Sequence, residues 1–431
     1  MSAAFYNPDL EATDRETLSR HQLDRVRAVV ARALEGSTFF QRKFRSAGLK
    51  SADEITSLDS LRGLPFTTKT DLVADHEEFP PFGSRLTEPV DNYCRLHQTS
   101  GTTGKPLRIV DTEESWAWWL RCWGYIYRAA DVGPKDRVFA AFSFGPFIGF
   151  WSGFEGSREV GAMRIAGGGQ TTEQRIQQIF DLGATVLMAT PTYALRMAEV
   201  AQEMGVDLTK SPIRCGIHAG EPGASIPSTR ARLESSWGME VFDHPGMTEV
   251  GPWGFECTAH AGVHLIESEY LFEVVDPRTD EPADEGELII TNLGRLSNPA
   301  IRYRTGDRVR LVRDRCACGR TFSRLEGGVI GRIDDMLIVR GVNVFPSAIE
   351  NIVRRFDGVA EFTVELYREH EMDEMEIRLE APQADGPSLA RAIESQVHID
   401  MGFRPRVKVE PSGALPRFEL KARRVFDRRT D

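Results

Sequence analysis

The sequence has few cysteines, no long apolar run and no excess of positive charge. Six cysteines among 431 residues are too few for a disulfide scaffold. They fit a reducing cytoplasm, where a close cysteine pair more often binds a metal. The longest uncharged stretch, Val138–Phe154, contains three glycines and Pro146 and falls short of the ~20 residues of a membrane-spanning helix. It predicts a buried strand followed by a loop, and no membrane association is expected.

The net charge and the first residues argue against nucleic-acid-binding and secreted proteins. Lys and Arg number 53 and Asp and Glu 64, so the net charge is −11, which argues against nucleic acid as the main partner. The stretch up to Asp14 lacks the basic start and apolar run of a secretory signal, so a cytoplasmic location is expected. With 41% hydrophobic and 27% charged residues, the chain is a globular protein of two or three domains.

Hydrophobic patterns predict an α/β fold. Strand-like and helical runs alternate from Tyr93 to about Asp243, which favours a largely parallel sheet. Asp111 and Thr112 can cap a helix that carries a stripe of aromatic residues. Strand-like segments follow Glu249. We therefore predict a large domain of layered sheets and helices (1–333), a β-rich subdomain within it (about 255–326), and a small, mobile α+β domain (334–431).

A glycine- and hydroxyl-rich loop is the strongest motif. Backbone N–H groups, hydroxyls and one ammonium group in such a loop can surround a polyphosphate. Thr99 and Pro106 stand where a Walker A loop needs Gly and Ser or Thr, so this is a different phosphate loop. Its residues are Ser100, Gly101, Thr102, Thr103, Gly104 and Lys105.

The phosphate loop and four later motifs resemble the adenylate-forming superfamily of acyl-CoA synthetases, peptide-synthetase adenylation domains and luciferases. The resemblance spans about residues 93–424, with the motifs in the family's order. The short chain and the segments at residues 341–347 and 421–425 are most similar to phenylacetate–CoA ligases. The four later motifs are residues 243–249, 303–307, 331–335 and 415–421.

The resemblance implies where ATP and Mg²⁺ bind. The phosphate loop would hold the β- and γ-phosphates, Asp307 the ribose hydroxyls and Asp243 the adenine amine, while Glu249 would help to hold Mg²⁺. Pro245 stands where relatives have a tyrosine, so another side chain must cover the adenine ring. The backbone from Ala219 would line that ring. The remaining expected nucleotide-binding residues are Gly220, Glu221, Pro222, Thr248 and Arg332.

The same resemblance gives Lys421 the sharpest role. Adenylation brings an anionic carboxylate against an anionic phosphate, so a cation between them stabilises the transition state. Lys421 would supply that cation from the small domain, with Glu249 as the second catalytic residue. Asp334, beside Arg332, would form the hinge about which the small domain rotates.

Cysteine spacing predicts a metal site. Cys316 and Cys318 form a tight pair, and Cys257 precedes two histidines. Three thiolates and one imidazole make a closed, structural Zn²⁺ site. Relatives carry a histidine that aligns with His264, and His260 is the competing ligand.

The sequence thus predicts an ATP-dependent, AMP-forming ligase that activates an aromatic carboxylic acid and transfers the acyl group to CoA. A carrier protein or an amine is the alternative acceptor, and a homodimer is one candidate assembly. A catalytically inactive nucleotide-binding module is a further alternative, which the presence of Lys421 and Glu249 disfavours. The expected acid pocket consists of Phe142, Phe147, Trp151, Ala219 and Gly246.

Overall fold

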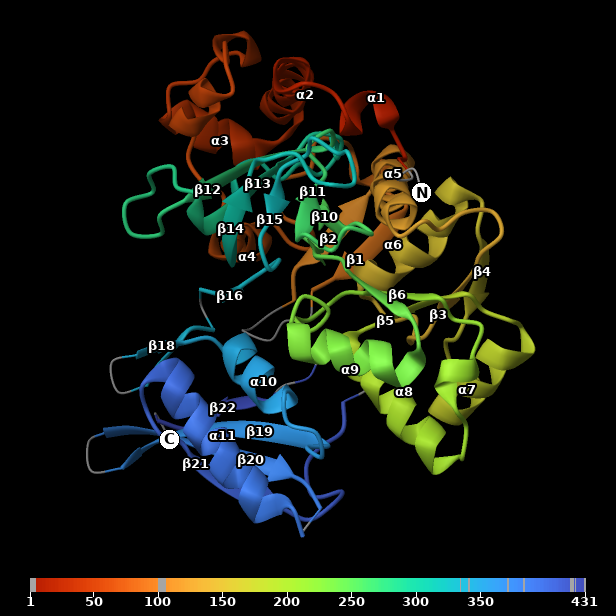
Figure 1. Ribbon diagram of the computed structural model, residues 1–431. Coiled ribbons are helices and arrows are strands. Elements are labelled where there is room, and N and C mark those ends of the chain that lie inside the picture. The colour runs from red at the N-terminus through yellow and green to blue at the C-terminus, as the bar shows by residue number, and fades with distance from the viewer. Residues whose placement is uncertain are drawn as a thin grey trace.

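The structure is a computed structural model in which a large part and a smaller C-terminal part, blue in Figure 1, lie against each other. The described residues are 5–99, 106–333, 335–339, 342–369, 372–382, 384–418, 422 and 424–429. The predicted residues Ser100, Gly101, Thr102, Thr103, Gly104, Lys105, Asp334 and Lys421 lie outside them.

Helices form the N-terminal layer. The long helix α2 begins after Asp14, whose carboxylate accepts a hydrogen bond from the Thr17 N–H group, and it buries Leu18, Val26 and Val30. This layer covers the antiparallel strands of the large part (Figure 1). Its elements are α1 (Pro8–Glu11), α2 (Arg15–Gly36), α3 (Thr38–Ser46), η1 (Ala52–Glu54), η2 (Asp59–Gly63), α4 (Lys69–Glu78) and η3 (Val90–Asn92).

A parallel sheet with the strand order β4-β3-β5-β6-β7 follows, as the alternating pattern predicts. Its central strands are buried, and helices pack against it. The strands are β3 (Arg137–Ala140), β4 (Met163–Ala166), β5 (Val186–Ala189), β6 (Cys215–His218) and β7 (Glu240–Asp243). The helices are α5 (Glu113–Ala129), α6 (Ile148–Gly156), η4 (Ser157–Val160), α7 (Thr172–Asp181), α8 (Pro191–Glu203), η5 (Leu208–Lys210) and α9 (Pro227–Trp237).

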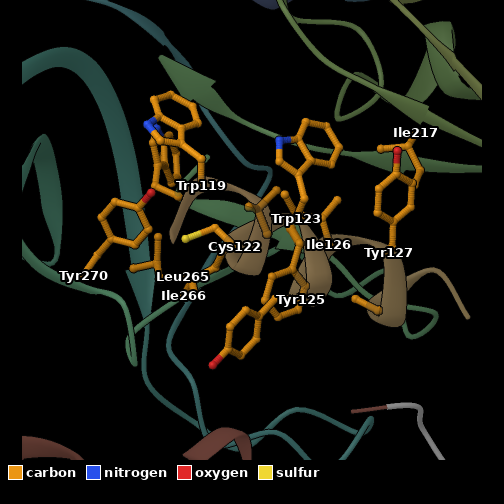
Figure 2. Packing of buried hydrophobic residues seen from close by; sticks show 14 of the residues in the cluster. Trp119, Cys122, Trp123, Tyr125, Ile126, Tyr127, Ile217, Leu265, Ile266 and Tyr270 are labelled. Carbon is orange, nitrogen blue, oxygen red and sulfur yellow. The ribbon is translucent and has the colours of Figure 1, made fainter. Parts of the chain in front are cut away.

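Helix α5 is the predicted aromatic helix. The Thr112 hydroxyl caps it by accepting a hydrogen bond from Ser115, while Asp111 belongs to the preceding strand. Trp119 and Trp123 enter the main core, where Tyr270 from an antiparallel strand joins them (Figure 2). The aromatic stripe is therefore core packing that joins the parallel sheet to the β-rich region.

Helix α6 corrects the prediction of a loop after the buried strand. The connection after β3 ends before Ile148, and α6 packs against α5. A Cβ atom on Gly153 would come within 2.9 Å of the Trp123 ring, and one on Gly156 within 2.4 Å of Trp123 Cβ. Glycine is needed here for close packing and not for a turn, which the sequence pattern does not distinguish.

The β-rich region is an antiparallel sheet with the order β10-β11-β15-β14-β13-β12, to which β16 adds beside β14. Short strand pairs lie beside it. The strands are β1 (Arg95–Gln98), β2 (Arg108–Asp111), β8 (Gly246–Met247), β9 (Gly251–Pro252), β10 (Gly254–Glu256), β11 (Val263–Leu265), β12 (Tyr270–Val275), β13 (Glu285–Asn292), β14 (Tyr303–Val312), β15 (Arg324–Leu325) and β16 (Gly331–Arg332).

The C-terminal part is a small α+β unit with its own core. Its main sheet has the order β21-β20-β19-β22, and β17 pairs with β18 in a separate hairpin. The elements are β17 (Leu337–Val339), β18 (Val342–Val344), α10 (Pro346–Arg354), β19 (Glu361–Glu369), β20 (Met372–Glu380), α11 (Gly386–Met401), β21 (Arg406–Glu410) and β22 (Val425–Asp427). The predicted α/β fold class is confirmed.

Across the described part of the chain, none of the helices combines the length and the apolar character that crossing a bilayer requires.

A buried ion pair anchors helix α1 to the β-rich region. Arg320 Nε donates to Glu11 Oε2 at 2.5 Å, and the Tyr6 and Asn7 N–H groups donate to Glu11 Oε1 at 2.7 Å each. Both charged side chains are almost completely buried.

We predict that Glu11→Gln lowers the free energy of unfolding by about 3 kcal/mol, because it removes the charge that a buried guanidinium faces. Glu16→Gln is the matched control, since Glu16 is 86% exposed and pairs with exposed Arg20; it should change stability by less than about 0.5 kcal/mol. Chemical denaturation measures both. Equal effects of the two substitutions would contradict a stabilising role for this pair.

Candidate active site

The candidate site lies at the carboxyl edge of the parallel sheet. His218 pairs with Asp243 in register, so the segments that follow β6 and β7 leave the sheet side by side. These segments contain the predicted residues 219–222 and 243–249. Ligands of open α/β sheets bind at this edge, and the two motifs thus meet where the fold type favours a site.

Asp243 is held in a polar but enclosed environment. The Ser225 hydroxyl donates a hydrogen bond to Asp243 Oδ2, and the Asp243 N–H group donates to Glu256 Oε2 at 3.0 Å. A Cβ atom on Gly328 would lie 3.3 Å from Asp243 Oδ2, so the β-rich region closes over this carboxylate. Burial, reinforced by the Glu256 charge, raises the pKa of the Asp243 carboxyl to about 6.

Asp307 and Arg332 form a second cluster on paired strands. They are opposite each other in β14 and β16, and Arg332 Nη1 lies 3.6 Å from Asp307 Oδ1. Gly306 has φ of +74°, a left-handed conformation that glycine adopts without strain and that bends the strand just before Asp307. Two motifs that are separate in the sequence are thus brought together.

A buried ion pair fixes the loop that carries Thr248 and Glu249. Arg295 Nη2 donates to Asp111 Oδ2 at 2.5 Å, and both side chains are fully buried. Arg295 Nη1 also donates to the carbonyl oxygens of Thr248 and Glu249, at 3.1 and 3.4 Å. The Glu249 carboxylate itself is mostly buried and lies 3.8 Å from Lys69 Nζ.

The predicted phosphate loop lies outside the described residues, but its flanking strands are described. Strands β1 and β2 pair antiparallel up to Gln98 and Arg108. Beyond them, Thr99 N–H donates to the Leu107 carbonyl, and Leu107 N–H donates to Thr99 Oγ1. Both ends of the loop are therefore held by a hairpin.

Some of the predicted acid-pocket residues lie together in an aromatic cluster. Phe142 follows β3 at the carboxyl edge and contacts Phe144, whose ring lies 4.5 Å from that of Trp151. Phe154, which sequence reasoning missed, completes this aromatic cluster at 5.2 Å from Phe144. Phe147 is 42% exposed. Gly246 and Ala219 lie beyond β7 and β6, at the same edge.

Glu221 at the sheet edge contacts the C-terminal part. Glu221 accepts hydrogen bonds from the Thr192 and Ala422 N–H groups, each at 2.8 Å. Arg424 donates to Glu361 at 2.8 Å and to Thr192 Oγ1 at 3.4 Å. Lys421 precedes Ala422 in the sequence and lies outside the described residues. The segment beside it is therefore joined directly to the candidate site.

Three cysteines and one histidine form a separate cluster. Their ligand atoms lie within 4.8 Å of one another, with Cys257 Sγ 3.8 Å from Cys316 Sγ and Cys318 Sγ 3.5 Å from His264 Nε2. His264 Nδ1 lies 3.2 Å from the Phe322 carbonyl and donates to it, which leaves Nε2 for a metal. Hydrogen bonding from Cys257, together with His264, lowers the pKa of the Cys318 thiol.

His260, the competing candidate ligand, is engaged elsewhere. Its Nε2 lies 2.8 Å from Glu240 Oε1, and its Nδ1 lies 3.3 Å from Glu256 Oε1. These carboxylates raise the pKa of His260. Among the two histidines that the sequence left open, the structure brings His264 into the cluster and turns His260 away.

Other site residues were not found from the sequence. Ser225, Glu256 and Arg295 lie outside the motifs, and their contacts arise only from folding. His244 lies inside a motif, but its burial and its hydrogen bond to the Gly254 carbonyl carry no sequence signal. For Glu221, the sequence predicted only that its backbone lines the adenine site. The role of its carboxylate was not predicted.

Comparison with known proteins identifies the family. Residues 11–294 match the AMP-binding enzyme family, and residues 341–429 match the AMP-binding enzyme C-terminal domain. The chain is 32% identical over 438 residues to a phenylacetate-coenzyme A ligase of Escherichia coli, covering 97% of each chain.

Solved structures of a CoA ligase share the fold of this chain. A 2-hydroxyisobutyryl-CoA ligase in the postadenylation state aligns with a TM-score of 0.93 at 28% identity, over 99% of this chain and 92% of the other. The same ligase with CoA in the thioesterification state aligns with a TM-score of 0.74 at 29% identity, over 98% and 92%. The chain therefore belongs to the AMP-binding, adenylate-forming enzyme family and is related over nearly its full length to phenylacetate-coenzyme A ligases.

Proposed function

We propose that this protein is an AMP-forming ligase that uses ATP to join a carboxylic acid to coenzyme A. One observation carries the proposal: the motif residues after β6 and β7 meet at the sheet edge, and Glu221 there binds the segment next to Lys421. The relationship to CoA ligases over nearly the whole chain supports coenzyme A as the acceptor.

In the first half-reaction, the acid's carboxylate oxygen attacks the α-phosphorus of ATP, and pyrophosphate leaves. Lys421 would place its ammonium group between the two anions and stabilise the charge of the transition state. The phosphate loop would hold the departing pyrophosphate. Asp307 would accept hydrogen bonds from the ribose hydroxyls, and Asp243 one from the adenine amine.

Mg²⁺ would be held by Glu249 and the phosphates of ATP. A mostly buried carboxylate whose backbone is fixed by Arg295 fits a hard ion that prefers oxygen ligands and keeps several waters. The ion would neutralise phosphate charge; the protein's contribution is to keep the Glu249 loop in place.

In the second half-reaction, the thiol sulfur of coenzyme A attacks the acyl carbon of the adenylate, and AMP leaves. The small domain would rotate between the two steps about Asp334, which moves Lys421 away from the acyl adenylate. A carrier protein or an amine remains the alternative acceptor, because each can attack the same acyl carbon.

An aromatic acid is the proposed substrate class. The cluster of Phe142, Phe144, Trp151 and Phe154 lies beyond the carboxyl end of β3 and offers ring faces and edges to an aryl group. The similarity to phenylacetate-coenzyme A ligases supports the same class.

We also propose a structural zinc ion at the cysteine cluster. Three thiolates and a neutral imidazole nitrogen fit the closed tetrahedral site that Zn²⁺ prefers, and the Phe322 carbonyl orients the imidazole from the second coordination sphere. The ligands would be Cys257, His264, Cys316 and Cys318. Zinc would tie β10 and β11 to the segment before β15.

The acceptor is tested by mass spectrometry of the products formed from ATP and an aryl acid. With coenzyme A present, we expect a CoA thioester and faster pyrophosphate release, because discharge of the acyl adenylate no longer limits turnover. Reactions without coenzyme A serve as the control. If only acyl-AMP forms with coenzyme A, and an amine or carrier protein alone discharges it, the protein is not a CoA ligase.

Zinc is tested by metal analysis of protein purified without chelator, which should contain about one Zn²⁺ per chain, the content of one closed site. Cys318→Ser should lower both the zinc content and the melting temperature, since metal binding stabilises the fold. Cys94→Ser is the control, because Cys94 is exposed and lies outside the cluster. Full zinc content in Cys318→Ser, or no zinc in the unmodified protein, would exclude the site.

A further inference from the structure

His244 is a buried histidine with one ring nitrogen that the protein does not use. It directly follows β7 and is 4% exposed. Its Nδ1 lies 2.7 Å from the Gly254 carbonyl oxygen, which can only accept, so Nδ1 carries a hydrogen. In the neutral ring, Nε2 is then a pure acceptor. None of the described residues donates a hydrogen bond to it.

The ring is held in the neutral form and in one orientation. Burial lowers the pKa of His244 to about 4, so the imidazole is uncharged near pH 7. The ring packs against Trp123 in an edge-to-face contact with 4.5 Å between ring centres. Trp123 is itself fixed, because its Nε1–H group donates to Ser152 Oγ at 2.8 Å.

Nε2 lies close to Gly246. Gly246 is exposed, although it lies between the buried residues His244 and Glu249. A Cβ atom on Gly246 would lie 3.4 Å from His244 Nε2, after Pro252 Cα at 3.2 Å and the Gly251 carbonyl oxygen at 3.3 Å. The unused nitrogen therefore lies beside Gly246, the glycine that the sequence predicts to line the acid pocket.

We propose that His244 Nε2 selects acids whose acyl part carries a hydroxyl or amino group, by accepting a hydrogen bond from it. The inference rests on the proposed ligase function. It specifies that the acid substrate carries a hydrogen-bond donor. An acid without a donor would cover Nε2 and leave its lone pair unpaired, which disfavours that acid. Methylation of the hydroxyl would remove the donor while the oxygen remains.

The test measures kcat/KM for acid-dependent pyrophosphate release with matched sets of acids. Phenylacetic, benzoic and isobutyric acids are each compared with their hydroxy or amino derivatives at every ring or chain position and with the corresponding methyl ethers. We expect at least one hydroxy or amino acid to exceed both its parent acid and its ether by about 10–100-fold, the range of one unpaired polar group.

Variants connect the preference to the imidazole. His244→Phe keeps a planar ring and removes the acceptor, so the ratio between the preferred acid and its parent should fall to near one. His244→Gln supplies an amide oxygen and should keep part of the preference. His398→Phe is the control and should keep the full ratio, because His398 is exposed on helix α11. A ratio within one variant does not depend on how much of that protein is folded.

The outcomes separate the two proposals. Adenylation of acids without any preference for a donor, or a preference that persists in His244→Phe, would overturn the role of His244 and leave the ligase function standing. Failure to adenylate any acid would overturn the ligase function and, with it, the inference that rests on it.

Discussion

The arrangement of the site depends on the two hydrogen bonds that the Glu221 carboxylate accepts. One oxygen binds the N–H group of Thr192 at the start of α8, and the other binds the N–H group of Ala422 in the C-terminal part. Hydrogen bonds to a charged acceptor are stronger than hydrogen bonds between neutral groups. Because Ala422 follows Lys421, this carboxylate links the sheet edge to the segment that carries the proposed catalytic lysine.

Glu249 and Asp243 are positioned by buried polar and charged side chains outside the motifs. Arg295, paired with Asp111, holds the carbonyl groups before and at Glu249. Ser225 and Glu256 hold the side chain and backbone of Asp243. Removing one partner of such a buried pair leaves a charge without compensation, so these contacts specify the geometry strongly. The motifs supply the chemistry, and these partners supply the positions.

The sequence was sufficient for the family, the fold class and the aromatic helix, because motif order and helical spacing are local properties. It failed for α6, where glycines serve close packing against Trp123. It left His260 and His264 open, since only the fold shows that Glu240 and Glu256 engage His260. The tautomer of His244 depends on the Gly254 carbonyl, which no sequence spacing reveals.

The central claim is that Glu221 holds the C-terminal segment in place for adenylation, and comparison of the two half-reactions in Glu221→Ala tests it most directly. Acid-dependent pyrophosphate release should fall by about 10²-fold, the effect of losing two hydrogen bonds to a charged group. Thioester formation from supplied acyl-AMP and coenzyme A should stay near the normal rate, because the proposed mechanism rotates the small domain before that step. Equal losses in both half-reactions would contradict the account.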